Sequence, residues 1–134
     1  MKNRLLLMDD ESAILFAYRK FFQHQGIAVD TVETRGEALN LLRQNTYLAV
    51  ILDLSLCGSN GEEGFELIDV VKGHYYRTKI IIVTACGSPE IEARAYRLGA
   101  DCYFEKPVST GIIRDKLKDL GFPMEIVDNR QEIG

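Results

Sequence analysis

Short apolar runs alternate with segments of helical periodicity along the whole chain. Ile80-Ile81-Ile82-Val83 shows no polar alternation, which is typical of a strand buried on both faces of a sheet. Ile14, Tyr18 and Phe22 follow the spacing of one helix face, which predicts an amphipathic helix. The predicted strands cover residues 5–9, 27–32, 48–53, 79–84 and 101–105. The predicted helices cover residues 12–25, 35–44, 65–73, 89–98 and 110–120.

Five β-α units in strict alternation predict an α/β fold, with a parallel sheet covered by helices on both faces. The chain has 134 residues, the size of one ordinary domain. We expect this domain to cover residues 1–121 and residues 122–134 to form a C-terminal tail. No output domain is visible in the sequence.

Composition narrows the choice of function class. The net charge is −4 and no cluster of Lys and Arg stands out, which argues against direct nucleic-acid binding. Only four apolar residues lie between Arg4 and Asp9, too few for a secretory segment or a membrane span. Cys57, Cys86 and Cys102 are odd in number and lack C-x-x-C spacing. They predict reduced thiols in a cytoplasmic protein.

Polar side chains stand at the ends of four predicted strands. Asp9 and Asp10 follow the first strand, Asp53 closes the third, Thr84 ends the fourth and Lys106 follows the fifth. The ends of parallel strands meet at one edge of the sheet, so these residues are expected to form one pocket. Three close carboxylates repel each other unless a cation such as Mg²⁺ joins them. The pocket therefore predicts a Mg²⁺-assisted phosphoryl acceptor, with Asp53 as the acceptor.

Each of these residues also has a purely structural interpretation. The Asp9-Asp10 pair can stabilise the start of a helix, and Asp53 can begin an ordinary loop. Lys106 and Pro107 can form a plain turn. The joint pattern favours the functional interpretation, because chance does not readily place five chemically matched residues at four strand ends.

At this point the chain resembles the receiver (response-regulator) domain of two-component signalling, over about residues 4–120. The resemblance implies a flavodoxin-like, doubly wound sheet in the order 2-1-3-4-5. The segments that carry it are Leu7-Met8-Asp9-Asp10-Glu11, Val50-Ile51-Leu52-Asp53-Leu54, Ile82-Val83-Thr84-Ala85, Leu98-Gly99-Ala100-Asp101 and Glu105-Lys106-Pro107.

The resemblance implies a role for each matching residue of the acidic site. Asp53 is the expected phosphoacceptor, and Asp9 and Asp10 are the expected Mg²⁺-binding acids. The backbone carbonyl of Ser55 is expected to complete the protein's metal contacts.

The resemblance also implies a switch beside this site. Thr84 and Lys106 are expected to sense the phosphoryl group, and Tyr103 is the expected aromatic that turns inward as Thr84 moves. The Lys106-Pro107 bond is expected to be cis. The side chains of Ser55 and Cys86 flank the phosphoryl site and are expected to tune its hydrolysis.

The implied function is a phosphorylation-activated signalling switch, not an enzyme with a separate substrate. A sensor histidine kinase or a histidine phosphotransfer protein is the expected donor, with Ile14 and Leu15 as candidate docking contacts. The surface around the fourth helix, fifth strand and fifth helix is expected to bind a downstream protein or a second copy of the chain.

Two departures from the family pattern lie after Asp53. Cys57 stands where proline is usual, and the stretch from Gly58 to Gly64 is longer than the common pattern. It contains Glu62 and Glu63, which either belong to a tolerated loop insertion or alter partner docking and metal affinity.

Other functions remain open at this point. A phosphatase of the haloacid-dehalogenase type needs a second acid two residues after its nucleophile, where this chain has Ser55. A flavin or dinucleotide binder shares the fold class, but no G-x-G-x-x-G follows the first strand. A receiver-like interaction module that is never phosphorylated is a third alternative, which the presence of all five site residues disfavours.

Overall fold

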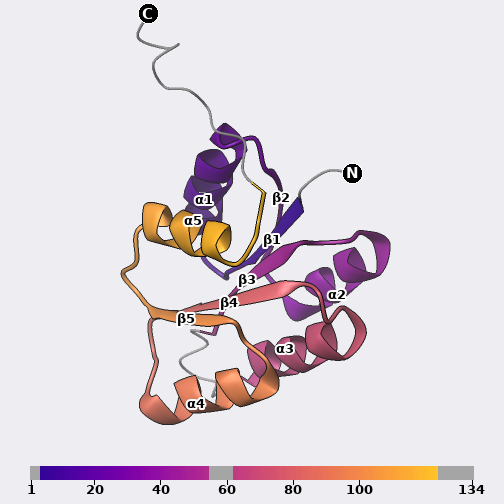
Figure 1. Cartoon of the computed structure of the whole chain (residues 1–134), viewed down its shortest axis with the longest axis vertical. Helices are drawn as coiled ribbons and strands as arrows, with labels where there is room; N and C mark the ends of the chain where they lie inside the picture. Colours follow the sequence, from indigo (N-terminus) through magenta and orange to yellow (C-terminus); the bar gives the residue numbers. More distant parts are fainter. Residues whose placement is uncertain (1–3, 55–61, 124–134) are drawn as a thin grey trace, which may run out of the picture.

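The computed structural model describes residues 4–54 and 62–123. Strands and helices alternate throughout these residues (Figure 1), as the apolar pattern predicts. The strands are β1 (Arg4–Met8), β2 (Ala28–Val32), β3 (Ala49–Asp53), β4 (Lys79–Thr84) and β5 (Cys102–Glu105). The helices are α1 (Ser12–His24), α2 (Arg35–Gln44), α3 (Glu62–His74), α4 (Pro89–Leu98) and α5 (Thr110–Asp119).

The five strands form one parallel sheet in the order β2-β1-β3-β4-β5, which confirms the predicted flavodoxin-like topology. In Figure 1, α1 and α5 cover one face of the sheet, and α2, α3 and α4 cover the other. β1 and β3 pair in register from Leu5 with Ala49 to Met8 with Leu52. The residues that follow these two strands therefore start from neighbouring positions at the same edge.

Each strand supplies side chains to two separate apolar layers. Leu5 and Leu7 pack in the layer that contains the buried residues of α1 and α5. Leu6 and Met8 pack in the layer that contains the buried residues of α2, α3 and α4. Because both faces are covered, nearly every position of β1, β3 and β4 is buried, and polar alternation in these strands would bury unpaired polar groups.

The start of α4 is defined by local side-chain chemistry. Ser88 accepts a hydrogen bond from the amide of Ile91 at 3.1 Å, and Pro89 occupies the first helical turn. Proline suits this position, because the amide it lacks would have no partner inside the helix. Gly99 ends the helix with a φ of 117°, a conformation that favours glycine. Local chemistry therefore defines both ends of α4.

α3 begins earlier than predicted. The structure starts it at Glu62, so Glu62, Glu63 and Gly64 belong to the helix, and their assignment to a long loop is wrong. Two carboxylates in the first turn suit the positive end of the helix dipole. Arg94 of α4 donates two hydrogen bonds to Glu62, at 2.7 and 3.1 Å, which link α3 to α4. Residues 58–61 lie outside the described part of the chain.

Among the described residues, no helix has the length and apolar character that a membrane span requires. Residues 124–134, which include most of the predicted tail, lie outside the described part. The division into a domain of residues 1–121 and a tail of residues 122–134 stays a prediction.

Candidate functional site

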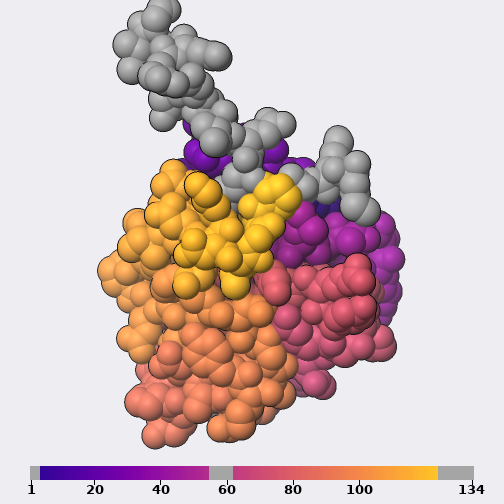
Figure 2. All heavy atoms as spheres, in the orientation of Figure 1, coloured from indigo at the N-terminus to yellow at the C-terminus, as the bar shows by residue number. Residues whose placement is uncertain are grey.

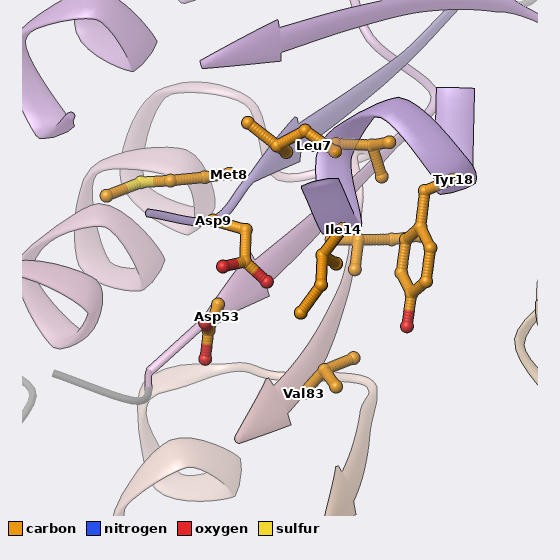
Figure 3. A pocket seen from close by; sticks show the side chains of 9 residues that line it. Leu7, Met8, Asp9, Ile14, Tyr18, Asp53 and Val83 are labelled. Atoms are coloured by element: carbon orange, nitrogen blue, oxygen red, sulfur yellow. The ribbon is translucent and has the colours of Figure 1, made fainter. Parts of the chain in front are cut away.

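Three carboxylates meet at the carboxyl edge of the sheet. Asp9 and Asp10 follow β1, Asp53 ends β3, and one carboxylate oxygen from each lies within 4.8 Å of the others. Asp9 and Asp53 are each 6% exposed, whereas Asp10 is exposed to solvent. Figure 3 shows the side chains of Asp9 and Asp53 close to each other, with Ile14 of α1 beside them. The predicted acidic cluster is therefore formed.

Lys106 follows β5 and joins this cluster from beyond the end of β4. Its Nζ donates hydrogen bonds to Asp9 Oδ2 at 2.9 Å and to Asp53 Oδ2 at 3.0 Å. Its backbone amide donates to the carbonyl of Thr84 at 2.8 Å, which fixes the end of β5 against the end of β4. The Lys106-Pro107 bond is cis, as expected. One ammonium thus bridges two buried carboxylates from different strands.

Burial and charge shift the pKa values of this cluster in different directions. Burial raises the pKa of Asp9 to about 6, and the charge of Asp53 adds to this effect against the lowering influence of Glu11 and Lys106. Burial works to lower the pKa of Lys106, but its hydrogen bonds to Asp9 and Asp53 outweigh burial and raise the pKa. The ammonium therefore stays charged, while Asp9 is ready to take up a proton near neutral pH.

Asp9 also contributes to the start of α1. Its Oδ1 accepts a hydrogen bond from the amide of Glu11, the residue that precedes the helix, at 2.9 Å. This local contact agrees with the helix-stabilising interpretation of the acidic pair. Its other oxygen faces Lys106. Asp9 therefore serves both the helix start and the site, and the two interpretations are not exclusive.

The predicted switch residues lie beside the cluster. Thr84 is almost fully buried, and its Oγ1 accepts a hydrogen bond from the amide of Cys86 at 3.2 Å. Tyr103 is 9% exposed, so its ring lies on the inner side of β5. Both residues are buried in the structure, with the ring of Tyr103 in an inward position, while their role in switching stays a prediction.

The cysteines differ from expectation. Cys86 is exposed and takes part in a disulfide bond, so the prediction that all three thiols are reduced is wrong for this residue. Cys102 is a free and buried thiol, whose pKa is raised by burial. Cys57 and Ser55 lie outside the described residues, and the predicted Ser55 carbonyl contact is not tested.

Tyr18 of α1 is a site residue that the sequence indicated only as part of a helix stripe. With Ile14 it lines the small pocket that contains Asp9 and Asp53 (Figure 3). Burial raises the pKa of Tyr18, and the charges of Lys106, Asp9 and Asp53 all act on it. Its i, i+4 spacing from Ile14 was the available signal. Helical periodicity alone does not distinguish a residue that lines a site from one that packs in the core.

The residues present fit a hard divalent cation. Carboxylate oxygens are the ligands that Mg²⁺ and Ca²⁺ prefer, and an exposed Asp10 leaves one side of the cluster open to water. Lys106 neutralises only one of the three negative charges when all are ionised. A cation beside Asp10 would remove the remaining repulsion.

The fold and site together define a class of protein: an α/β domain with an acidic pocket and a bridging lysine at the switch point of its sheet. A model of the response regulator receiver domain family matches residues 5–118. The chain therefore belongs to that family. Receiver domains of this kind are phosphorylation-activated regulatory switches rather than catalysts acting on a separate substrate.

Individual relatives support this assignment. The chain is 32% identical over 120 residues to regulatory protein VanRB of Enterococcus faecalis, which covers 90% of this chain and 53% of that protein. It is 31% identical over 113 residues to the alginate biosynthesis transcriptional regulatory protein AlgB of Pseudomonas putida, covering 84% of this chain and 25% of that protein. The chain thus spans about half or less of these curated relatives.

Solved structures agree with the observed fold. A CheY-like response regulator receiver domain protein from Methanospirillum hungatei aligns with a TM-score of 0.81 and 27% identity, covering all of both chains. The beryllofluoride-activated NtrC4 receiver domain dimer aligns with a TM-score of 0.78 and 26% identity, covering 87% of this chain and 94% of that chain.

The raised pKa of Asp9 predicts that acid stabilises the metal-free chain. Its pKa is about 6 in the folded state and near 3.8 ordinarily, so the folded state binds a proton that the unfolded chain does not. Lowering the pH from about 7.5 to about 5.5 is expected to raise the free energy of unfolding by about 1 kcal/mol. Urea denaturation with a chelator present measures this change.

Asp9→Asn should remove most of this pH dependence, and Asp10→Asn, at an exposed position, should retain it. Equal pH dependence in wild type and Asp9→Asn would contradict the assignment.

Proposed function

We propose that Asp53 accepts a phosphoryl group from a phosphohistidine of a cytoplasmic sensor kinase or histidine phosphotransfer protein. In this step the N–P bond of the donor breaks and a bond forms between phosphorus and a carboxylate oxygen of Asp53. The observation that carries the proposal is the bridge from Lys106 to Asp9 and Asp53, in a pocket that also contains Asp10. A cation and an acceptor are thus held where an anionic group would be transferred.

Lys106 is proposed to contact the phosphoryl group once it is on Asp53. In the present arrangement its Nζ contacts Asp53 Oδ2 directly, so a phosphoryl group on Asp53 would place new oxygens within reach of the same ammonium. Phosphoryl transfer proceeds through a loose and strongly anionic transition state, which the protein mainly positions and neutralises. A lysine acts here as a mobile point charge.

Mg²⁺ is the proposed metal of this site. The carboxylates of Asp9, Asp10 and Asp53 would hold it, and the backbone carbonyl of Ser55 is proposed as a further ligand. The bound ion would supply positive charge to the phosphoryl oxygens. Mg²⁺ retains several waters when few protein ligands are available, which suits a site with an exposed Asp10.

Thr84 is proposed to pass the signal from the phosphoryl group to Tyr103. Its buried hydroxyl oxygen accepts from the amide of Cys86, while its O–H group would donate to a charged phosphoryl oxygen, a stronger hydrogen bond. Movement of Thr84 would change the space available to Tyr103, whose ring lies on the same side of the sheet. Phosphorylation would then shift a two-state equilibrium at the surface.

The donor is proposed to dock between α1 and the segment after β5. A cavity of about 430 Å³, open at the surface, is lined there by Ile14, Tyr18, Lys106, Pro107 and Val108. The cavity is largely apolar and Lys106 belongs to both the cavity and the acidic site. Leu15, the other candidate docking contact, is buried in the core and is not available for docking.

The output surface is proposed to be formed by α4, β5 and α5. These elements make one continuous side of the molecule in the space-filling view (Figure 2). Tyr96 on α4 and Ile112 on α5 are 45% and 51% exposed, which leaves apolar area for a downstream protein or a second copy of the chain. Sedimentation velocity with and without phosphorylation tests whether the partner is a second copy of the chain. A chain that stays monomeric after phosphorylation would leave a downstream protein as the partner.

The alternatives are less well supported. A phosphatase of the haloacid-dehalogenase type lacks its general acid, since Ser55 stands two residues after Asp53. A receiver-like module that is never phosphorylated has no need of a lysine held between two buried carboxylates.

Asp53 is expected to be the site of phosphorylation. Incubation with Mg²⁺ and acetyl phosphate should add one phosphoryl group to the intact mass of the chain, and Asp53→Asn should abolish this gain. Asp69→Asn, at an exposed position on α3, is the matched control and should leave the gain unchanged. Retention of the label in Asp53→Asn would overturn the proposal.

Ser55 and Cys86 are proposed to affect the lifetime of the phosphoryl group more than its yield. Ser55→Ala or Cys86→Ala is expected to change the decay rate by about threefold or more, which corresponds to about 0.7 kcal/mol in the barrier. The loss of label is followed by intact mass after the donor is removed. Cys102→Ala, at the free and buried thiol, serves as the control, and wild type with reductant separates the disulfide from the side chain. Unaltered decay in both variants would argue against the proposal.

The docking surface predicts a difference between protein and small-molecule donors. Ile14→Ala is expected to slow transfer from a phosphorylated histidine phosphotransfer domain by about fivefold or more, the effect of an interface residue worth about 1 kcal/mol. Acetyl phosphate needs no docking surface, so its rate should hardly change. Phe16→Ala, on the same helix at a position 61% exposed and outside the cavity, is the control. Equal slowing by both donors would place the effect in the chemistry of the site instead.

A further inference from the structure

Gly87 lies in the segment between β4 and α4, three residues after Thr84. A Cβ atom at this position would overlap the hydroxyl oxygen of Tyr103. It would also lie 3.0 Å from Glu105 Oε1 and 3.2 Å from Thr84 Cγ2, both tighter than ordinary van der Waals contact. The hydroxyl of Tyr103 therefore occupies the space that a side chain at position 87 would fill.

The backbone at Gly87 does not itself require glycine. Its φ lies outside the left-handed region, which among the glycines of the described residues is adopted by Gly26, Gly99 and Gly121. No left-handed φ therefore requires glycine at this position. Glycine at this position is explained by the space around it and not by the turn that leads into α4.

Packing is the main restraint on the inward position of Tyr103; burial raises the pKa of its hydroxyl, and the nearby backbone of Ser88 offsets this only in part. The hydroxyl oxygen of Tyr103 is fully buried, yet it has no hydrogen-bond partner among the described residues. Burying a hydroxyl without a partner is unfavourable, so the free energy that favours the inward ring position over the outward one is small. A small loss of space around the hydroxyl is enough to favour the outward position.

We propose that Gly87 is the positioning residue that admits Tyr103 to its inward position. The same glycine borders the methyl group of Thr84, so the proposed sensor and the proposed switch aromatic meet at its Cα. A side chain at position 87 would hold the ring outward whether or not Asp53 is phosphorylated. The consequence of this idea for signalling rests on the proposed function, whereas the ring position itself does not.

The test follows the ring of Tyr103 directly. The chain has six tyrosines, so ¹⁹F NMR of protein labelled with 3-fluorotyrosine gives few resonances, and Tyr103→Phe identifies the one from position 103. In wild type this resonance should show little solvent-isotope shift between H₂O and D₂O. In Gly87→Ala it should acquire the shift of an exposed tyrosine. A resonance that stays buried in Gly87→Ala would overturn the proposal.

A double-mutant cycle separates the positioning role from a general need for glycine. The clash is with the hydroxyl oxygen, and the other atoms of Tyr103 lie no nearer than 3.2 Å to the added Cβ. Gly87→Ala is therefore expected to raise the equilibrium constant of unfolding in both backgrounds. The increase should be about fivefold larger in the wild-type chain than in Tyr103→Phe. Equal effects in both chains would show that the hydroxyl is not the clashing group, and would overturn the proposal.

Gly36→Ala is the matched control, because a Cβ at Gly36 has no neighbouring atom within 4 Å. It should leave the resonance of Tyr103 unchanged.

Intact mass after treatment with acetyl phosphate distinguishes this proposal from the proposed function. Gly87→Ala should still gain one phosphoryl group. If wild type gains none, the proposed function fails, while the ring measurement, made without phosphate, still decides the role of Gly87.

Discussion

The site depends on one ammonium group that lies between two buried carboxylates. Asp9 and Asp53 come from neighbouring strands, and their carboxylates would repel each other because both are largely buried. Lys106 reaches both at 2.9 and 3.0 Å, although it follows β5, which is separated from β3 by β4. The long lysine side chain spans the end of β4, and the hydrogen bond from its amide to Thr84 fixes where it starts. The acidic pocket can persist without metal because of this bridge.

The same arrangement connects the pocket to the surface through a few residues. Thr84 ends β4 beside Asp53, Gly87 follows within the next turn, and Ser88 caps α4. Tyr103 on β5 fits against this segment from the other side. A displacement of Thr84 by a small distance therefore changes the packing of an aromatic ring and the start of a helix together. Close packing makes such a response a change between two arrangements and not a gradual deformation.

Links between helices limit how far α4 can move in response. Arg94 of α4 donates two hydrogen bonds to Glu62 of α3 and stacks over the ring of Phe65, with 4.1 Å between its guanidinium carbon and the ring centre. These contacts are at the surface, where an ion pair contributes little on its own. The contacts of Arg94 therefore connect α4 to α3 without fixing its position rigidly.

Much of the fold was readable in the sequence because its signals are local. The run Ile80-Ile81-Ile82-Val83 needs cover on both faces whatever its neighbours are, and the Ser88-Pro89 pair begins a helix by its own chemistry. The start of α3 was missed because Glu62 and Glu63 are polar residues that carry no apolar periodicity, which is the signal that predicts a helix. The disulfide at Cys86 was missed because cysteine spacing does not reveal which thiols approach each other.

By itself the sequence determined the order of strands and helices, and it determined that acidic and basic residues stand at the ends of strands. Both follow from periodicity and from chain position, which are properties of short segments. Only the tertiary structure decided that Lys106 lies between Asp9 and Asp53, and that the hydroxyl of Tyr103 fills the space beside Gly87. These contacts join residues far apart in the chain, and their distances depend on how the sheet twists and how its helices pack.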